Sequence, residues 1–297
     1  MTASAPSTAS TGGRKGSASA AEPPEVMAQA SSENFPVASR LLPRTARGDL
    51  LAVYGFARLV DDAGDEASGD RLALLDELEG DLEAAFVRGG APSHPLISAL
   101  RPTIARRSLP IEPFRALIEA NRRDQLVHRY QTFAELLGYC ELSANPVGEL
   151  VLGILDAATP RRLELSNRIC SALQLVEHWQ DVAEDHRRGR VYLPAEDLER
   201  FGVLDQELAD HAATESFKRL MAFEVARARG MLSEGAPLVR TLRGRSAFAV
   251  AAFVAGGRAA LLAVERADFD VLASRPRPGA ALRAQQLLAT LLRPESR

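Results

Sequence analysis

From about residue 33 onward, apolar residues recur at intervals of three and four, the spacing that lets an α-helix bury one face. The segment 70–88 is an example, because Leu72, Leu75, Leu78 and Leu82 fall on one side of a helix. We find no alternating strand pattern of convincing length and no internal repeat. Alanine and leucine dominate and aromatic residues make up 5%, which favours helices over a β-sandwich. We therefore predict an all-α fold, a single-domain bundle of roughly eleven helices.

The spacing also predicts where the elements lie. Helices are expected over 47–66, 70–88, 95–107, 112–127, 132–157, 161–185, 194–201, 205–211, 214–235, 243–272 and 279–292. The arginine- and glycine-rich stretch 186–194 is predicted to be a loop between two of these helices. Small polar residues and prolines dominate 1–25, so we expect a disordered tail there and one helical domain over 26–297.

Composition excludes several classes of function. The chain has 36 basic and 39 acidic residues, a net charge of −3, which provides no basic field for a nucleic-acid partner. The tail has no apolar stretch typical of a secretory signal. The most apolar run, 247–257, ends at Arg258, short of the roughly 20 residues that a membrane-spanning helix needs. We therefore expect a cytoplasmic protein that binds no nucleic acid.

Two acidic clusters stand out, and the first ends an otherwise apolar helix. Asp61 and Asp65 are four residues apart and share one helix face, which continues through Arg58 and Tyr54. Acids at a helix C-terminus oppose the helix dipole, and neighbouring carboxylates repel each other. Such a locally unfavourable arrangement is typical of functional sites. The alternative is a frayed, solvated helix end followed by an acidic turn.

The second cluster repeats this arrangement. Glu177, Asp181 and Asp185 lie at successive steps of four, with Gln174 one turn earlier on the same side. Adjacent carboxylates raise one another's pKa unless a cation sits among them, and Mg²⁺ prefers oxygen ligands. If the two helices face each other, their acids form two rims of one cavity in which Mg²⁺ can hold a diphosphate. We predict that five acids bind this metal: Asp61, Asp65, Glu177, Asp181 and Asp185.

Three motifs resemble those of the head-to-head trans-isoprenoid synthases, the family of squalene, dehydrosqualene and phytoene synthases. They are YGFARLVDDAGDE at 54–66, YCELSANPVG at 139–148 and QDVAEDHRRGRVYLP at 180–194. The resemblance runs from about residue 31 to residue 277 and implies an isoprenoid-synthase helical bundle with a central substrate cavity. It implies that Asp61, Asp65, Asp181, Asp185 and Tyr54 are catalytic. It further implies these substrate-binding residues: Arg58, Arg190, Tyr192, Gln174, Tyr139, Ala144, Gly148 and Phe35.

Within this family, the segment ENFPVAS at 33–39, together with WQDV and SANPVG, is similar to the bacterial hopanoid-pathway branch. That branch converts presqualene diphosphate to hydroxysqualene and pyrophosphate with Mg²⁺. Two positions depart from the common family pattern. Glu177 stands where asparagine is usual, and Gln180 stands where condensing members commonly have arginine, which removes one cation. Both changes favour an enzyme that handles one diphosphate, since a second would be repelled.

Two other functions stay open at this point. One is condensation of two prenyl diphosphates to presqualene diphosphate, squalene or phytoene. The other is a non-catalytic helical partner subunit that keeps the fold. Because the expected substrate is a C30 lipid, the protein is expected to collect it at the inner membrane face or from an upstream enzyme, and to supply a downstream one.

Overall fold

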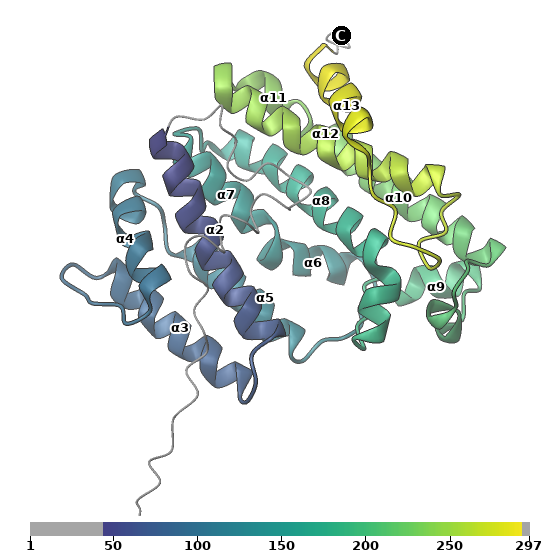
Figure 1. Ribbon diagram of the computed structural model, residues 1–297, viewed down its shortest axis with the longest axis horizontal. Coiled ribbons are helices and arrows are strands. Elements are labelled where there is room, and N and C mark those ends of the chain that lie inside the picture. Colours follow the sequence, from purple (N-terminus) through teal and green to yellow (C-terminus); the bar gives the residue numbers. More distant parts are fainter. Residues whose placement is uncertain (1–43, 293–297) are drawn as a thin grey trace, which may run out of the picture.

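The computed structural model describes residues 44–292, which consist of helices joined by short connections (Figure 1). The elements are α2 (Arg44–Asp65), α3 (Arg71–Phe86), α4 (Pro95–Arg107), α5 (Glu112–Asp124), α6 (Phe133–Ser143), α7 (Asn145–Ile154), α8 (Pro160–Arg187), α9 (Ala195–Phe201), the 3₁₀-helix η1 (Asp205–Ala209), α10 (Glu215–Gly235), α11 (Leu238–Thr241), α12 (Gly244–Arg266) and α13 (Ala280–Leu292). Within 44–292 there is no β-strand, and an isolated bridge joins Arg129 to Val191. The all-α prediction is confirmed. The tail predicted over 1–25 lies outside the described residues.

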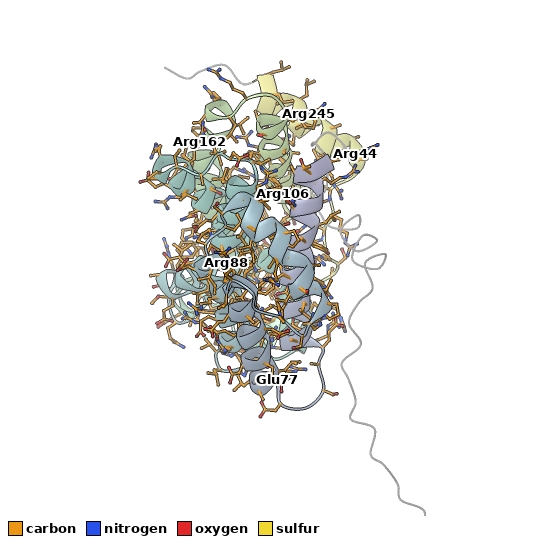
Figure 2. The ribbon with its side chains drawn as sticks, turned by 90° about the vertical axis from the view of Figure 1, so that its left-hand side faces the viewer. Arg44, Glu77, Arg88, Arg106, Arg162 and Arg245 are labelled. Carbon is orange, nitrogen blue, oxygen red and sulfur yellow. The ribbon has the colours of Figure 1, made fainter. Side chains whose placement is uncertain are left out.

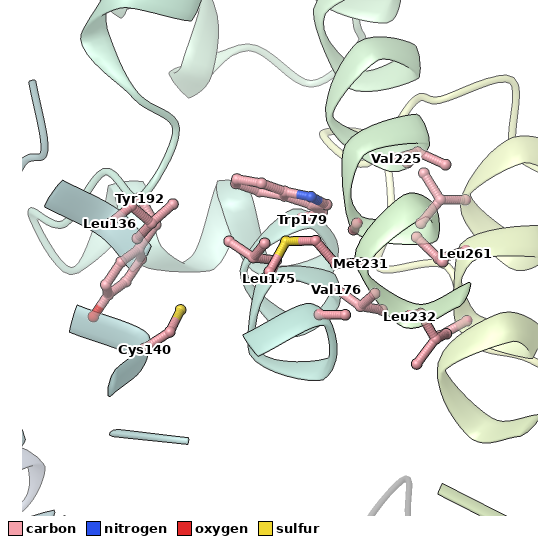
Figure 3. Close-up of a cluster of buried hydrophobic side chains, with 14 of the residues drawn as sticks. Leu136, Cys140, Leu175, Val176, Trp179, Tyr192, Val225, Met231, Leu232 and Leu261 are labelled. Carbon is pink, nitrogen blue, oxygen red and sulfur yellow. The ribbon is translucent and has the colours of Figure 1, made fainter. Parts of the chain in front are cut away.

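The longest helix, α8, runs through the middle of the molecule and packs against α6 and α7 and against α10 and α12 (Figure 1). Its Leu175 and Trp179 are fully buried. Figure 3 shows them in one cluster with Leu136 of α6, Leu232 of α10 and Leu261 of α12. Apolar burial on this face leaves the opposite face of α8, which carries the acids, free to border a cavity.

A second apolar cluster joins α2, α3, α4 and α5. At its centre the rings of Phe56 and Phe114 meet edge to face, with 5.2 Å between their centroids. The short helix α7 links the two clusters, because Leu150 belongs to this one and Leu152 to the cluster around α8. On the outer side, seen in Figure 2, α3 and the loop after it carry charged side chains such as exposed Glu77. The two acidic helices, α2 and α8, are thus positioned by separate cores.

The helix predicted over 132–157 is two helices in the structure. It breaks at Ala144, between α6 and α7, so the predicted single element is wrong. Pro146 explains the break, because it has no backbone N–H and its ring would clash with the carbonyl oxygen four residues earlier in a continuous helix. The break turns α7 so that it packs against α5, α6 and α8.

The helix predicted over 243–272 ends at Arg266, because Asp268 and Phe269 adopt positive φ angles of 53° and 60°. Helix α12 also continues through Arg258, the residue at which the apolar run 247–257 stops. The Arg258 guanidinium donates to Thr290 of α13 at 2.8 Å.

By length and composition alone, α12 is long and apolar enough to cross a membrane. The expectation that no segment is long and apolar enough to do so is therefore wrong. Most of its apolar stretch is nevertheless buried inside the protein, where α12 packs against α8, α10 and α13.

Candidate active site

The acidic ends of α2 and α8 face the same cavity. Asp61 and Asp65 of α2 and Asp181 and Asp185 of α8 all line a cavity of about 280 Å³. Glu177, one turn before Asp181, lines it as well. The structure therefore brings together the five acids predicted to bind metal. We call Asp61 and Asp65 the α2 rim, and Asp181 and Asp185 the α8 rim.

A larger cavity of about 610 Å³ adjoins the first and shares part of its wall. Asp61, Asp65, Asp124 and Arg190 line both cavities, together with Arg188. The remaining lining of the larger cavity is polar and consists of Arg58, Asp62, Glu66, Arg71, Gln125 and His128. Such a lining suits a charged, hydrated group such as a diphosphate better than a hydrocarbon chain.

Side chains from three other segments hold the α2 rim. The amide of Asn121 on α5 donates to the Asp61 carboxylate at 3.1 Å, and Arg190 pairs with Asp65 at 2.8 Å. Gln125 donates to the carbonyl oxygen of Gly64 at 3.0 Å, and Arg71 donates to that of Asp65 at 2.9 Å. The last carbonyl groups of a helix have no donor within it, so these side chains satisfy the end of α2.

The α8 rim is held by the segment 273–279, which precedes α13. Arg275 Nε lies 2.7 Å from the Asp181 carboxylate. Next to it, the buried amide of Gln180 donates to the carbonyl oxygen of Pro276. Gln180 itself supplies no positive charge to this rim, but its neighbour in space does. Gln180 fixes the Pro276 carbonyl, and the adjacent Arg275 supplies a positive charge in place of the missing arginine.

Both rims hold carboxylates that ionise less readily than usual. Restricted hydration raises the pKa of Asp61 and that of Asp181, each to about 6. Asp61 is open to the cavity, but the surrounding walls exclude much of the bulk water. Repulsion from Asp65 and Asp185 acts in the same direction, whereas the Asn121 amide at Asp61 and the Arg275 guanidinium at Asp181 oppose it. A cation that entered between the rims would relieve this repulsion.

Aromatic side chains form one wall of the smaller cavity. Tyr139 donates its hydroxyl to Asp124 at 2.7 Å, and Tyr192 donates to the same carboxylate at 3.4 Å. The ring of His178 stacks on Tyr192, with centroids 3.7 Å apart. Burial raises the pKa of both tyrosines, so they keep their protons at neutral pH. The wall is therefore lined by neutral phenols next to one buried carboxylate.

The loop predicted over 186–194 is shorter than expected, and both of its ends are anchored. Helix α8 continues to Arg187, and the N–H of Val191 donates to the carbonyl oxygen of His128 at 2.8 Å. Tyr192 and the residues beside it are buried. The turn formed by residues 188–190 between these anchors carries Arg190, which reaches across to the α2 rim.

The remaining predicted substrate-binding residues have mixed positions. Arg58 lines the larger cavity and pairs with Asp62 at 2.8 Å, and Gln174 lines the smaller one beside His178. Tyr54 is half-buried, one turn before Arg58. Within the described part of the chain, the lining of the two cavities excludes three predicted residues: Tyr54, Ala144 and Gly148. Phe35 lies outside the described residues.

Gly148 has a packing role where α7 crosses α8. A Cβ atom at this position would overlap the side chains of Ser166 and Cys170, so glycine lets the two helices approach this closely without displacing those side chains. Ala144 is buried at the break between α6 and α7.

The acids form no ready-made metal cage. Between residues 44 and 292, no group of three or more His, Cys, Asp or Glu side chains is arranged to hold a metal ion. The donor set nevertheless fits Mg²⁺, because this ion usually binds through one or two carboxylates together with water and substrate phosphate. Each rim offers two carboxylates on consecutive helical turns. The residues thus fit a Mg²⁺ ion that binds together with a phosphate-bearing substrate.

Sequence interpretation missed three residues of this site: Asn121, Asp124 and Arg275. Asp124 ends an amphipathic helix beside two arginines, a pattern typical of a solvated helix end. Arg275 lies in RPRPG, whose prolines and glycine are typical of a break between helices. No sequence signal distinguishes Asn121 from a surface residue. All three acquire their surroundings from helices distant in the chain.

Comparison with known proteins identifies the family. The sequence matches the squalene/phytoene synthase family over residues 28–282. It is 33% identical over 257 residues to a 15-cis-phytoene synthase from Synechococcus elongatus, covering 82% of this chain and 83% of the relative. It is 32% identical over 212 residues to a hydroxysqualene synthase from Rhodopseudomonas palustris, covering 71% and 72%. The solved structure of squalene synthase HpnC from Alicyclobacillus acidocaldarius is 43% identical, with a TM-score of 0.76, covering 81% of this chain and 91% of that one.

The chain belongs to the squalene/phytoene synthase family, and its fold is the isoprenoid-synthase helical bundle of that family. Members of this family are isoprenoid diphosphate synthases, so the family prediction and its enzymatic class are confirmed. The two relatives from Synechococcus and Rhodopseudomonas are named for different reactions at almost equal identity. The particular reaction therefore has to be inferred from the residues of the site.

Proposed function

We propose that this protein ionises presqualene diphosphate with Mg²⁺ and lets water capture the rearranged carbocation, giving hydroxysqualene and pyrophosphate. The observation that carries the proposal is that the α2 rim and the α8 rim border one cavity whose wall includes Arg190. The proposed metal ligands are Asp61, Asp65, Glu177, Asp181 and Asp185. When bound, Mg²⁺ neutralises the departing pyrophosphate and so favours breakage of the carbon–oxygen bond.

The chain's own residues have two tasks in this reaction. Arg190 and Arg58 grip the diphosphate, since a guanidinium fork matches two phosphate oxygens. Tyr139 and Tyr192 stay protonated, and a neutral phenol traps a carbocation less readily than a phenolate. The carbon–oxygen bond breaks with its electron pair going to pyrophosphate. The cyclopropylcarbinyl cation that remains rearranges with opening of its three-membered ring. A water oxygen then bonds to the rearranged cationic carbon, and the proton that this water loses passes to pyrophosphate.

Support for presqualene diphosphate as the substrate comes from the sequence and from one relative. The segment 33–39 is similar to the hydroxysqualene-forming branch, and the Rhodopseudomonas relative carries the name of that enzyme. Glu177 adds a negative charge beside the α8 rim, which disfavours a second diphosphate.

Condensation of two prenyl diphosphates is the second candidate, and Arg275 is the observation that favours it. Its pairing with Asp181 returns to the α8 rim a cation that the sequence had suggested was missing. A site with cations at both rims has more capacity to hold two diphosphates. The Synechococcus relative carries the name of a phytoene synthase, which fits this second candidate.

The lipid character of the substrate supports further proposals on location. We propose a cytoplasmic protein that contacts the inner membrane face or an upstream enzyme to collect its C30 substrate, and that passes its product to a downstream enzyme. A C30 hydrocarbon is too apolar to travel freely through water, which is the physical reason for this contact.

The test is incubation of the protein with Mg²⁺ and, in separate reactions, farnesyl, geranylgeranyl and presqualene diphosphates, followed by product identification. We expect hydroxysqualene and pyrophosphate from presqualene diphosphate alone, and none when EDTA replaces Mg²⁺. Efficient formation of presqualene diphosphate or phytoene from the shorter substrates would establish the condensing function instead. If none of the three diphosphates released pyrophosphate, the protein would instead be a non-catalytic partner subunit.

A further inference from the structure

We propose that Asn121 is a positioning residue that aims the carboxylate of Asp61 into the cavity, and that Gly64 provides the space in which it does so. Asn121 lies on α5, outside the acidic motifs, and is 7% exposed. The inference rests on the proposed function, because it takes Asp61 to be a ligand of Mg²⁺.

The contacts of Asn121 leave its amide little freedom. Its Nδ2 donates to Oδ1 of Asp61 at 3.1 Å and to the carbonyl oxygen of Leu117 on its own helix at 3.2 Å. The backbone carbonyl of Asn121 accepts a bond from Gln125, which also donates to the carbonyl oxygen of Gly64. The amide of Asn121 is thus fixed by α5 and directed at one oxygen of Asp61. Within residues 44–292 the Asn121 amide is the hydrogen-bond donor to the Asp61 carboxylate, and Oδ2 is left for a ligand from the cavity.

The close contact between Gly64 and the Asn121 side chain is the second observation that supports the inference. A Cβ atom built on Gly64 would overlap the amide oxygen of Asn121 and crowd the rest of its side chain. Helix α2 therefore has to carry glycine at this position for the Asn121 side chain to lie against it. An alanine there would push aside the end of a side chain and no backbone, so the fold should tolerate it while the bond to Asp61 is lost.

This arrangement resembles the general way in which proteins orient metal ligands. A carboxylate that binds a metal usually accepts a hydrogen bond from an outer residue, and loss of that bond typically lowers metal affinity by about 10–100-fold. The α8 rim has a different device, since Asp181 pairs with a charged guanidinium. A neutral amide holds Asp61 without contributing a full positive charge that would compete with Mg²⁺ for the carboxylate.

The experiment measures Mg²⁺ binding by calorimetric titration in the presence of saturating inorganic pyrophosphate. We expect Asn121→Ala to weaken Mg²⁺ binding by about 10–100-fold, and Gly64→Ala to weaken it by a similar factor. The matched control is Gly48→Ala, which makes the same substitution on the same helix in open space and should bind Mg²⁺ like the unmodified chain. Unfolding midpoints recorded without Mg²⁺ should show that all three variants remain folded.

The double variant gives the sharpest result. Once Asn121→Ala has removed the amide, the methyl group added by Gly64→Ala has nothing left to displace. The combined variant should therefore bind Mg²⁺ no more weakly than Asn121→Ala alone. Additive losses in the double variant, or unchanged Mg²⁺ binding by folded Asn121→Ala, would overturn the inference and leave the proposed function standing. Failure of the unmodified chain to bind Mg²⁺ with pyrophosphate would overturn the proposed function and this inference with it.

Discussion

The two rims have the same D-x-x-x-D spacing, but the structure surrounds them differently. On the α2 rim, a neutral amide contacts Asp61, and Arg190 pairs with Asp65, whose side chain is 41% exposed. On the α8 rim, Arg275 pairs with Asp181, which is 21% exposed, while Asp185 faces His178 at 3.9 Å. The α2 rim is open and is held by side chains from three other segments. The other is more enclosed and held by a segment near the C-terminal end of the fold.

The difference shows that equal spacing does not create equal sites. Arg190 follows α8 in the chain but pairs with the α2 rim, so it links the two rims. Arg275 follows α12 and serves the α8 rim alone. The two rims should therefore be equally necessary for turnover. They should differ in how strongly their arginines bind anions and in how much the side chains that hold them stabilise the fold.

The largest expected effect comes from removing one carboxylate from either rim. Asp61→Asn and Asp181→Asn should each lower turnover of presqualene diphosphate by at least about 10²–10³-fold, because the leaving group loses part of its electrostatic stabilisation. The double variant should be little worse than either single one, since both rims act on one diphosphate. The control is Glu77→Gln, at an exposed acid on α3. Near-normal turnover in one single variant would show that its rim is dispensable.

The next effect separates the two arginines. Arg190→Gln should weaken pyrophosphate binding in the presence of Mg²⁺ by roughly 10–100-fold, because a charged hydrogen-bond donor that lines both cavities is lost. Arg275→Gln should weaken it by roughly tenfold or less, since this side chain is 32% exposed, against 15% for Arg190. Titration calorimetry measures both, with Arg88→Gln as a surface control. An equal loss at Arg275 would strengthen the condensing alternative.

A smaller effect concerns the supports of the rims. Gln180→Ala removes a buried donor from the Pro276 carbonyl and should lower the free energy of unfolding by about 1–3 kcal/mol. Gln125→Ala, the matching change at the α2 rim, should cost less, about 0.5–1.5 kcal/mol, because its amide is only half-buried. Urea denaturation of the metal-free protein measures both. The reverse order would mean that the α2 rim, and not the α8 rim, is the more firmly supported.

The smallest effect is on the pH dependence of stability without metal. Asp61 and Asp181 have pKa values of about 6 in the folded protein, above their ordinary value of 3.8. The stability that each acid contributes is therefore fully present below pH 4 and is lost as the pH rises through 6. Melting temperatures of Asp61→Asn and Asp181→Asn should match that of the unmodified chain at pH 4 and exceed it at pH 7. The gain should be similar at the two acids, because their pKa values are raised to the same extent, and a melting temperature at pH 7 equal to that of the unmodified chain would contradict the raised pKa.

Much of the fold could be predicted from local patterns. The helical spacing predicted α3, α4 and α10 almost to their ends, and the motifs predicted the family. The errors lay where one residue overrides the spacing. Pro146 splits the helix predicted over 132–157, and the positive φ angles at Asp268 and Phe269 end α12 early. Periodicity reports which face of a helix is apolar, but it does not report where a single backbone conformation stops the helix.

The sequence by itself determined the all-α class, the family and the placing of each acid pair on one helix face, because residues four apart always share a face. Only the tertiary structure decided which groups stand against those acids. The Asn121–Asp61 contact spans 60 residues of chain, and the Gln180–Pro276 contact that places Arg275 spans 96. Helical geometry acts over a few residues and can be read locally. The partners of a charged group depend on how distant helices pack, and no local pattern encodes that packing.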